Sequence, residues 1–245
     1  MRLADLLEAA AALKVGVVQV ADNLPLHELD SGELREALDQ AVSLGLTIEV
    51  GTRGIEPTHL LRYLEIAAEF KAVLLRTLTH AAGSQPSLTQ AEKWIREVLR
   101  EFEIRGVTLG LENYEAHSCR DLATLVCRLE SSHVGICLDT VNSLGALETP
   151  ECVVQTLAPL TVNLHVKDFD IERAPHRMGY TVRGVPAGTG QLTIPWLLKQ
   201  MPSGGNISAI LEQWPPPGES IDATVSMERE WAERGIQYLR CCGCT

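Results

Sequence analysis

VTLGLE, residues 107–112, is a short run in which bulky aliphatic residues alternate with small or polar ones, and it ends on a carboxylate. Side chains of a β-strand point alternately to its two faces. Leu109 and Leu111 therefore lie on one face. Gly110 and Glu112 lie on the other. The pattern predicts a strand with one apolar face and one small or polar face that ends in a side chain able to bind a metal.

Three further runs repeat this pattern. They are VGICLD, which ends on Asp139, TVNLHV, which contains His165, and ISAILE, which ends on Glu212. In each run the ligand-type residue lies on the face opposite the aliphatic residues next to it. Four strands in the same phase indicate one convergent site.

Helix and strand patterns alternate along the chain. The expected strands cover residues 15–20, 46–50, 72–77, 107–112, 134–139, 161–166 and 207–212, with helical stretches between them. Strands separated by helices of this kind are typical of βαβ units in a parallel sheet. Each strand carries a polar or small face, including Gln19, Glu49 and Arg76 in the first three. A doubly wound sheet has helices on both faces and favours apolar strands, so the sequence predicts an α/β fold of the (β/α)8 TIM-barrel type.

The predicted barrel is one strand short. Seven strands are expected, whereas a closed barrel of this type needs eight. The pattern opens on a helix, ADLLEAAAALK, so the missing strand is expected to be the first. A segment before Met1, a partner subunit or another element could cover the exposed strand edges, and the sequence leaves these alternatives open. Without a linker or a composition shift, residues 1–245 are expected to form a single TIM-barrel domain.

The composition indicates a globular protein and argues against several classes of partner. The chain of 245 residues is 45% hydrophobic and 22% charged, with a formal net charge of −11. That charge disfavours nucleic acid and anionic membrane surfaces. The sequence has no membrane-spanning apolar run and no signal-peptide pattern, so a cytoplasmic location is expected. The seven cysteines match no zinc-binding spacing and are assigned no function.

The four ligand-type residues form a predicted metal site: Glu112, Asp139, His165 and Glu212. All of them fall at or near the carboxyl ends of strands, where TIM barrels carry their active sites. Three carboxylates and one imidazole form a mainly oxygen donor set that suits Mn²⁺ or Mg²⁺, with Co²⁺ or Zn²⁺ as alternatives. Converging acidic groups would repel one another unless a cation lay between them, which favours a divalent metal over purely structural polar residues.

Several motifs surround these residues. They are ENYEAHS from Glu112, LDTVNSLG around Asp139, LHVKD around His165, VPAGTGQLTIPWLL, and ILEQW around Glu212. In order and spacing they resemble the xylose isomerase-like superfamily of sugar isomerases and epimerases, which also includes endonuclease IV. The resemblance runs from about residue 15 to the C-terminus. It implies that the four residues bind one divalent metal and that Glu112 and Glu212 exchange a substrate proton.

The leading prediction is an isomerase or epimerase of a small keto-sugar or a derivative. A metal that chelates a carbonyl and the adjacent hydroxyl would acidify the neighbouring C–H bond and stabilise an enediolate. Glu112 and Glu212 are therefore the predicted catalytic residues, because one can remove the proton while the other returns it. The expected partner is a small-molecule sugar or sugar acid. A homodimer is also expected, as is common among such barrels.

A lyase is the alternative. Epimerases of the family carry a second acidic residue after the first metal-binding glutamate and a histidine three residues after the aspartate, but here these neighbourhoods hold His117-Ser118 and Asn142. Arginines in the connection from Phe169 to Gln191 suit a carboxylate or phosphate. A dehydratase or decarboxylase of an oxo-sugar acid is therefore a second hypothesis, and a non-catalytic barrel ranks last. The predicted substrate-binding residues are Lys167, Arg76, Arg173 and Asn142.

Overall fold

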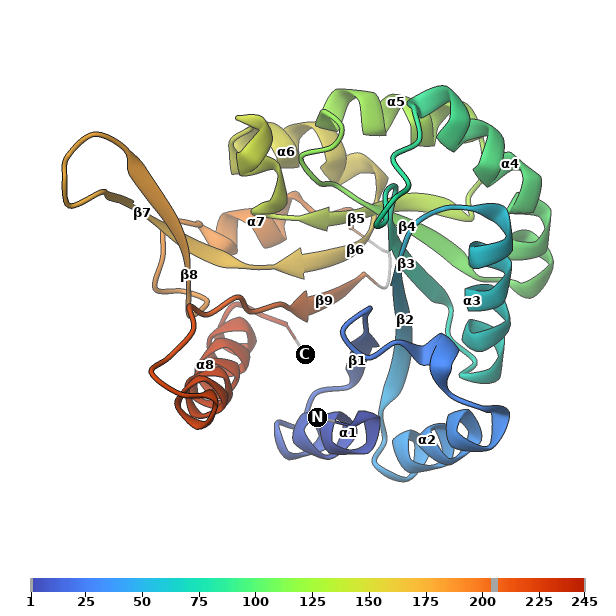
Figure 1. Cartoon of the computed structure of the whole chain (residues 1–245), viewed down its shortest axis with the longest axis horizontal. Helices are drawn as coiled ribbons and strands as arrows, with labels where there is room; N and C mark the ends of the chain where they lie inside the picture. The colour runs from blue at the N-terminus through green and yellow to red at the C-terminus, as the bar shows by residue number, and fades with distance from the viewer. Residues whose placement is uncertain (1, 204–206, 245) are drawn as a thin grey trace.

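A parallel sheet of seven strands curls into a nearly closed barrel in the computed structural model, which describes residues 2–203 and 207–244 (Figure 1). The strands, in spatial order, are β1 (Val17–Val20), β2 (Thr47–Arg53), β3 (Leu74–Leu78), β4 (Thr108–Glu112), β5 (Val134–Asp139), β6 (Thr161–Val166) and β9 (Ser208–Leu211). All seven expected strands are present, and every neighbouring pair is parallel. The prediction of a TIM barrel that lacks its first strand is confirmed.

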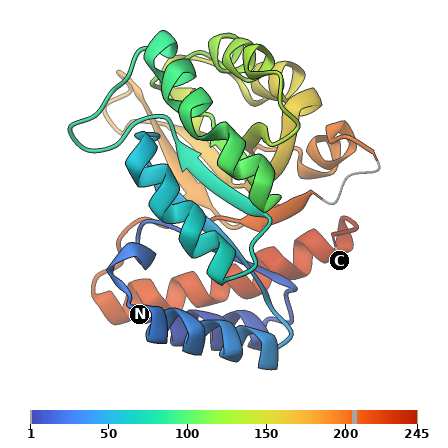
Figure 2. The same cartoon turned by 90° about the vertical axis from the view of Figure 1, so that its right-hand side faces the viewer.

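Helices cover the outside of the barrel (Figures 1 and 2). They are α1 (Leu3–Ala12), α2 (Ser31–Ser43), α3 (Pro57–Glu69), α4 (Leu88–Arg105), α5 (Cys119–Leu129), α6 (Pro150–Leu157), α7 (Ile194–Gln200) and α8 (Ile221–Cys241). Short 3₁₀ helices, η1 (Leu26–Glu28), η2 (Asn142–Ala146) and η3 (Ala158–Leu160), lie in the connections. Among the described residues no helix is both long and apolar enough to cross a membrane.

Residues that precede the helices explain where several of them begin. The Asp30 side chain accepts hydrogen bonds from two backbone N–H groups at the start of α2. Ser87, Ser118 and Thr149 do the same for one N–H group each at α4, α5 and α6. These caps satisfy N–H groups that have no partner within the helix.

The apolar faces of the strands form the core between sheet and helices. Leu109 and Leu111 of β4 are fully buried, as are Ile136 and Leu138 of β5. They belong to one continuous hydrophobic cluster that includes Ile95 and other helix residues. Burial of this apolar surface stabilises the barrel and leaves the polar faces of the strands directed inward.

One irregularity lies between β5 and β6. Ile136 pairs with Thr161 while the next residue, Cys137, pairs with Asn163, so Val162 is the additional residue of a bulge. A Cβ atom at Gly135 would lie 2.4 Å from Cγ1 of Val162. The glycine is therefore needed for the close approach of the bulged residue. Beyond the bulge, the register places Asp139 opposite His165.

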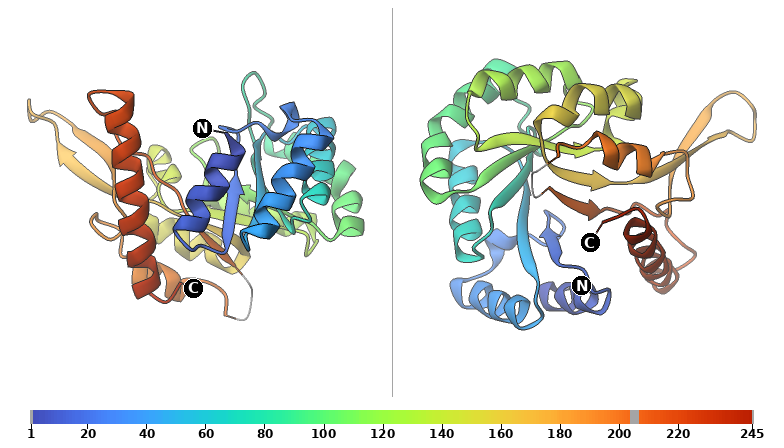
Figure 3. Two further views of the ribbon diagram at one scale, coloured as in Figure 1. Left: turned by 90° about the horizontal axis from the view of Figure 1, so that it is seen from below. Right: turned by 180° about the vertical axis from the view of Figure 1, so that it is seen from behind.

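The barrel is open between β1 and β9. These two strands approach each other, but no ladder of backbone hydrogen bonds joins them within residues 2–203 and 207–244. Helices α1 and α8 lie on either side of this opening (Figure 3). Side chains bridge it instead, because Gln19 of β1 donates a hydrogen bond to Asn163 of β6, and Ser208 of β9 donates one to Glu49 of β2.

The connection after β6 contains a hairpin that the sequence analysis did not predict. β7 (Asp168–Arg173) and β8 (Tyr180–Val185) form an antiparallel pair that projects from the barrel (Figure 1). Ile171 pairs with Val182 on one face of this hairpin. The sequence analysis treated Phe169 to Gln191 as a connection between helix and strand patterns, whereas two stretches of it form these strands. A cavity of about 240 Å³ lies beside the hairpin, with Trp196 in its lining.

Alkaline pH is expected to destabilise the fold through Cys119. Burial raises the pKa of this thiol to about 12, whereas a thiol in an unfolded chain titrates near a pH of about 8.5. The folded state keeps a proton that the unfolded state loses, so the free energy of unfolding should fall as the pH rises above about 8.5. Urea unfolding at about pH 8 and about pH 10 tests this.

The matched variant for this test is Cys119→Ala. It should reduce the pH dependence without abolishing it, since burial also raises the pKa of the Cys137 thiol. An unchanged dependence in the variant would show that Cys119 is not responsible. The exposed thiol of Cys127 provides a control position where the same change should have no effect.

Candidate active site

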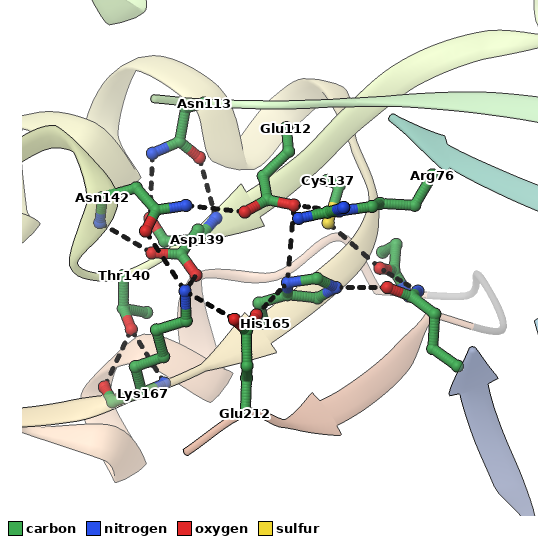
Figure 4. A network of polar contacts seen from close by, with 12 residues as sticks. Arg76, Glu112, Asn113, Cys137, Asp139, Thr140, Asn142, His165, Lys167 and Glu212 are labelled. Carbon is green, nitrogen blue, oxygen red and sulfur yellow. Dashed lines mark hydrogen bonds and ion pairs between the residues drawn. The ribbon is translucent and has the colours of Figure 1, made fainter. Parts of the chain in front are cut away.

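Strand parity and register bring the four predicted ligand residues together inside the barrel (Figure 4). Glu112 ends β4, Asp139 ends β5 and His165 lies near the end of β6. Glu212 directly follows β9 and donates its backbone N–H to the carbonyl of Val166 at 3.1 Å. One ligand atom from each of the four residues lies within 4.8 Å of the others. The convergence expected from the sequence is present in the structure.

The two carboxylate oxygens of Asp139 differ: one accepts backbone hydrogen bonds and the other accepts none from the described residues. Its Oδ1 accepts the backbone N–H groups of Val141 at 2.8 Å and Asn142 at 2.7 Å. Its Oδ2 is buried and has no hydrogen bond from the described residues. The Lys167 ammonium lies 3.0 Å from Oδ2, close enough to attract it electrostatically. Oδ1 therefore holds the turn after β5, while Oδ2 remains available to a ligand.

The two ring nitrogens of His165 also differ in their hydrogen bonding. Its Nε2 lies 2.7 Å from Oε1 of Gln19 and forms a hydrogen bond with it. Its Nδ1 is buried, has no well-directed hydrogen bond among the described residues, and lies 2.8 Å from Oε2 of Glu212 and 3.6 Å from Oε2 of Glu112. A lone imidazole nitrogen and an unbonded carboxylate oxygen that face other carboxylates are the arrangement expected at a metal site. The oxygen-rich donor set could hold a hard divalent cation.

Two buried cations adjoin the acidic cluster. Lys167 Nζ lies 2.9 Å from Oε1 of Glu212 and 3.1 Å from Oδ1 of Asn142, in addition to its contact with Asp139. Arg76 Nε pairs with Oε2 of Glu112, and Arg76 Nη1 donates a hydrogen bond to a backbone carbonyl of β2 at 3.1 Å. Both side chains are almost fully buried, so their positive charges interact with the cluster under weak solvent screening.

The charges of the cluster shift several pKa values. Burial raises the pKa of Asp139, and the nearby Lys167 charge opposes this only in part. For Glu212, burial is outweighed by the His165 imidazole 2.8 Å away and by the charge of Lys167, so its pKa is lowered. The pKa of Lys167 is raised because Asp139 and Glu212 outweigh its burial. Lys167 is thus held as a cation and Glu212 as an anion.

The family model described as xylose isomerase-like TIM barrel matches residues 7–242 of the chain. The protein belongs to this family. It is 37% identical over 238 residues to 3-oxo-isoapionate decarboxylase of Pectobacterium atrosepticum, a match that covers 97% of this chain and 86% of that protein.

Two solved structures show how closely the fold is shared. A crystal structure of D-psicose 3-epimerase in the presence of D-fructose has a TM-score of 0.74 at 17% identity and covers 98% of this chain and 92% of that one. A xylose isomerase-like TIM barrel protein from Mycobacterium smegmatis in complex with magnesium has a TM-score of 0.68 at 15% identity, with 96% and 88% covered. At these identities the similarity establishes the fold alone. The relatives named for their activity, the decarboxylase and the epimerase, are enzymes.

Two asparagines organise this xylose isomerase-like site. Asn142 Nδ2 donates to Oε1 of Glu112 at 2.6 Å, which brings the predicted substrate-binding asparagine into the cluster. Asn113 accepts the backbone N–H of Asp139 at 2.7 Å and donates to its carbonyl at 3.0 Å, so it ties the ends of β4 and β5 together. The sequence analysis gave Asn113 no role. Its place directly after a ligand residue was the available signal.

Arg173 is the one predicted site residue that the structure does not bring to the cluster. It ends β7, and its guanidinium donates to Oη of Tyr180 at 2.6 Å and to the carbonyl of Arg177 at 3.0 Å. The same group stacks on the Tyr180 ring at 4.6 Å. The physical reason is the unpredicted hairpin, which carries Arg173 out of the barrel mouth. Its position gives no support to substrate binding.

Asp168, which follows Lys167 in the H-x-K-D run, holds a loop. Its Oδ2 accepts the backbone N–H groups of Gly188 and Gly190, both at 2.9 Å. Its Oδ1 accepts those of Phe169 at 2.9 Å and Leu192 at 3.1 Å. The carboxylate is buried and occupied by four backbone donors. These contacts give Asp168 a structural role in the loop after Phe169.

Asp168→Asn is expected to lower the free energy of unfolding by about 2–4 kcal/mol, because an amide nitrogen would face backbone N–H groups that need an acceptor. Urea unfolding measures the change. The same substitution at exposed Asp39 in α2 is the matched control and should change stability by about 0.5 kcal/mol or less. Equal effects at the two positions would contradict the assigned role of Asp168.

Proposed function

We propose that the protein is a divalent-metal-dependent lyase that decarboxylates a small 3-oxo sugar acid. The observation that carries this proposal is the pair of buried cations, Lys167 and Arg76, beside the acidic cluster. The three carboxylates of the ligand set contribute −3 and the two cations +2, so these five buried or half-buried side chains sum to −1, with the partly exposed Asp22 3.8 Å from Arg76 at their edge. A bound divalent ion would bring the sum to +1. A positive site favours an anionic substrate such as a carboxylate over a neutral sugar.

The contacts of the two glutamates also favour decarboxylation over epimerisation. Epimerisation needs carboxylates that are free to remove and return a proton. Both oxygens of Glu112 already accept hydrogen bonds, one from Arg76 and one from Asn142. The pKa of Glu212 is lowered by His165 and Lys167 despite burial, which weakens it as a base. Decarboxylation of a 3-oxo acid does not require a base to remove a proton from carbon.

The residues of the cluster have separate roles in this proposal. Glu112, Asp139, His165 and Glu212 would hold the ion, which when bound supplies a Lewis acid beside the 3-oxo group. Lys167 and Arg76 orient the substrate carboxylate. The bond between the carboxyl carbon and its neighbour then breaks, CO₂ leaves, and the electron pair moves toward the oxo oxygen. Lys167, held as an ammonium ion, stabilises that developing negative charge. A proton from water finally replaces the carboxyl group on carbon.

The named relative supports the same class of reaction. The chain is similar over nearly its whole length to 3-oxo-isoapionate decarboxylase. Isomerisation or epimerisation, the leading expectation from the sequence, would use the same metal site. The two reactions differ in whether a C–C bond breaks, and that difference decides the experiment.

The test incubates the protein with Mn²⁺ and candidate 3-oxo sugar acids in D₂O. We expect release of CO₂ in proportion to the substrate consumed, and one deuterium per product molecule on the carbon that lost the carboxyl group. NMR of the product and of the remaining substrate gives both quantities. Deuterium in recovered keto-sugars without CO₂ would instead identify an isomerase or epimerase. Absence of both reactions over a panel of sugar acids and ketoses would reject catalysis of either kind.

A further inference from the structure

We propose that Gln19 is a positioning residue that fixes the Nε2–H tautomer of His165, and that Glu49 holds Gln19 in the orientation this requires. The inference rests on the proposed metal site. It assigns a function to a polar network that lies inside the barrel and that none of the steps above uses. The network joins Gln19 and Glu49 to Asn163 and Ser208.

The orientation of the Gln19 amide follows from its partners. Its Nε2 lies 3.0 Å from Oε2 of Glu49 and 3.0 Å from Oδ1 of Asn163. A carboxylate can only accept hydrogen bonds, so the NH₂ group of Gln19 must face Glu49. The amide oxygen of Gln19 must then face the imidazole of His165, at 2.7 Å from Nε2.

The orientation of Asn163 is fixed in the same way. Its Nδ2 donates to Oε2 of Glu49 at 3.2 Å and to Oγ of Ser208 at 2.7 Å. Ser208 in turn donates its hydroxyl proton to the other oxygen of Glu49. Glu49 therefore accepts from three side chains and acts as the anchor of the network. Reversal of either amide would bring an oxygen against this carboxylate.

The tautomer of His165 follows from the orientation of Gln19. An amide oxygen can only accept, so Nε2 of a neutral His165 must carry the proton. The lone pair then lies on Nδ1, the nitrogen that faces the carboxylates of Glu112 and Glu212 without a well-directed hydrogen bond. A metal-binding histidine is typically held by a hydrogen bond from its other nitrogen in this manner.

The opposite tautomer has an alternative partner in this site. With a proton on Nδ1, His165 would donate to Oε2 of Glu212 across 2.8 Å. That hydrogen bond would occupy two of the four ligand atoms at once. Without the acceptor at Gln19, this arrangement is expected to compete with metal binding. Gln19 thus keeps both ligands available.

The first experiment removes the acceptor with Gln19→Met, which keeps the length and apolar stem of the side chain. We expect the affinity for Mn²⁺ and for Zn²⁺, measured by calorimetry, to fall about 10- to 100-fold. Thr161→Val is the matched control. Thr161 starts β6, the strand of His165, and the change removes its buried side-chain hydrogen bond to the Leu157 carbonyl at the end of α6, outside the network. Metal affinity should be unchanged.

The second readout is the protonation of His165 itself. In metal-free protein labelled with ¹⁵N-histidine, at about pH 8.5 where an ordinary imidazole is neutral, we expect the Nε2–H form at His165. Comparison with the spectrum of His165→Gln assigns the signal. Gln19→Met should shift it toward the Nδ1–H form, which a general loss of stability would not do.

A double substitution tests the role of Glu49. Gln19→Glu alone would bring two carboxylates together and should bind metal more weakly. Gln19→Glu combined with Glu49→Gln removes this repulsion, since it keeps one negative charge and an acceptor beside His165, with the amide of Asn163 reversed to match. The double variant should recover the affinity lost by Gln19→Glu, at least in part.

Each outcome decides a separate claim. Wild-type metal affinity in Gln19→Met together with an unchanged histidine spectrum would overturn the inference and leave the proposed function intact. Weak binding without recovery in the double variant would overturn the role of Glu49. A wild-type protein that binds neither Mn²⁺ nor Zn²⁺ would reject the proposed metal site. The histidine spectrum of the metal-free protein still tests the tautomer in that case.

Discussion

Replacing Lys167 with methionine is expected to lower the rate of CO₂ release about 10³-fold or more. Lys167 is buried, and its Nζ lies 3.0 Å from Oδ2 of Asp139 and 2.9 Å from Oε1 of Glu212, so it places a positive charge directly beside the proposed ligands. Methionine keeps much of the volume but cannot stabilise negative charge that moves onto the substrate. Single-turnover and steady-state rates of CO₂ release with Mn²⁺ present measure the effect.

The same substitution should affect the metal-free protein in a second way. Removal of one partner from a buried ion pair leaves an uncompensated charge and costs about 3–5 kcal/mol. We therefore expect a lower melting temperature for Lys167→Met without metal, and partial recovery with excess Mn²⁺ because the ion neutralises the same carboxylates. Lys199→Met, at the exposed end of α7, is the matched control for both measurements. Activity within about threefold of wild type would contradict the proposed role of Lys167 in decarboxylation.

Asp139→Asn is expected to abolish function through the metal. The amide oxygen can keep the two backbone hydrogen bonds that Oδ1 accepts, so the turn after β5 should persist. The charge on Oδ2, which faces the cluster without a hydrogen bond, is lost. We expect Mn²⁺ affinity to fall about 100-fold or more and CO₂ release about 10³-fold or more. Calorimetry and the CO₂ assay measure the two effects independently.

Asp222→Asn on the exposed start of α8 provides the control for charge alone. A variant at position 139 that binds Mn²⁺ as wild type does would remove this residue from the metal site. Retained binding with lost activity would instead give the carboxylate a role toward the substrate. Glu212→Gln supplies a further comparison. A non-catalytic barrel would show no activity in the wild-type protein and no change of any measured activity in this variant.

Much of the fold and the ligand set could be predicted because both depend on local periodicity. Alternation along Thr108–Glu112 and its counterparts fixes which side chains face the barrel interior. Parallel strands in register then place their carboxyl ends at one edge, as with Asp139 opposite His165. The first step needs no knowledge of distant contacts, and the shared edge in the second follows from the parallel order of the strands. The inward orientation of Gln19, Glu49 and Arg76 followed from the same rule.

Three features were decided only by the tertiary structure. The β7–β8 hairpin carries Arg173 away from the cluster, and its strands stabilise each other through pairs such as Ile171 with Val182, which depend on long-range register. Lys167 and Arg76 lie close to three carboxylates and change the net charge of the site. This net charge can be added up only when the distances between the side chains are known. The orientation of the Gln19 amide depends on a carboxylate 30 residues away in sequence.

The sequence by itself therefore determined the barrel, its inward-facing side chains and the four candidate ligands. The tertiary structure decided the electrostatic balance and the hydrogen-bond directions around those ligands. The physical reason is the range of the interactions. Strand parity is set by the chain's own backbone geometry, residue by residue. Coulomb energies and donor–acceptor pairing depend on atoms that only folding brings within a few ångströms of one another.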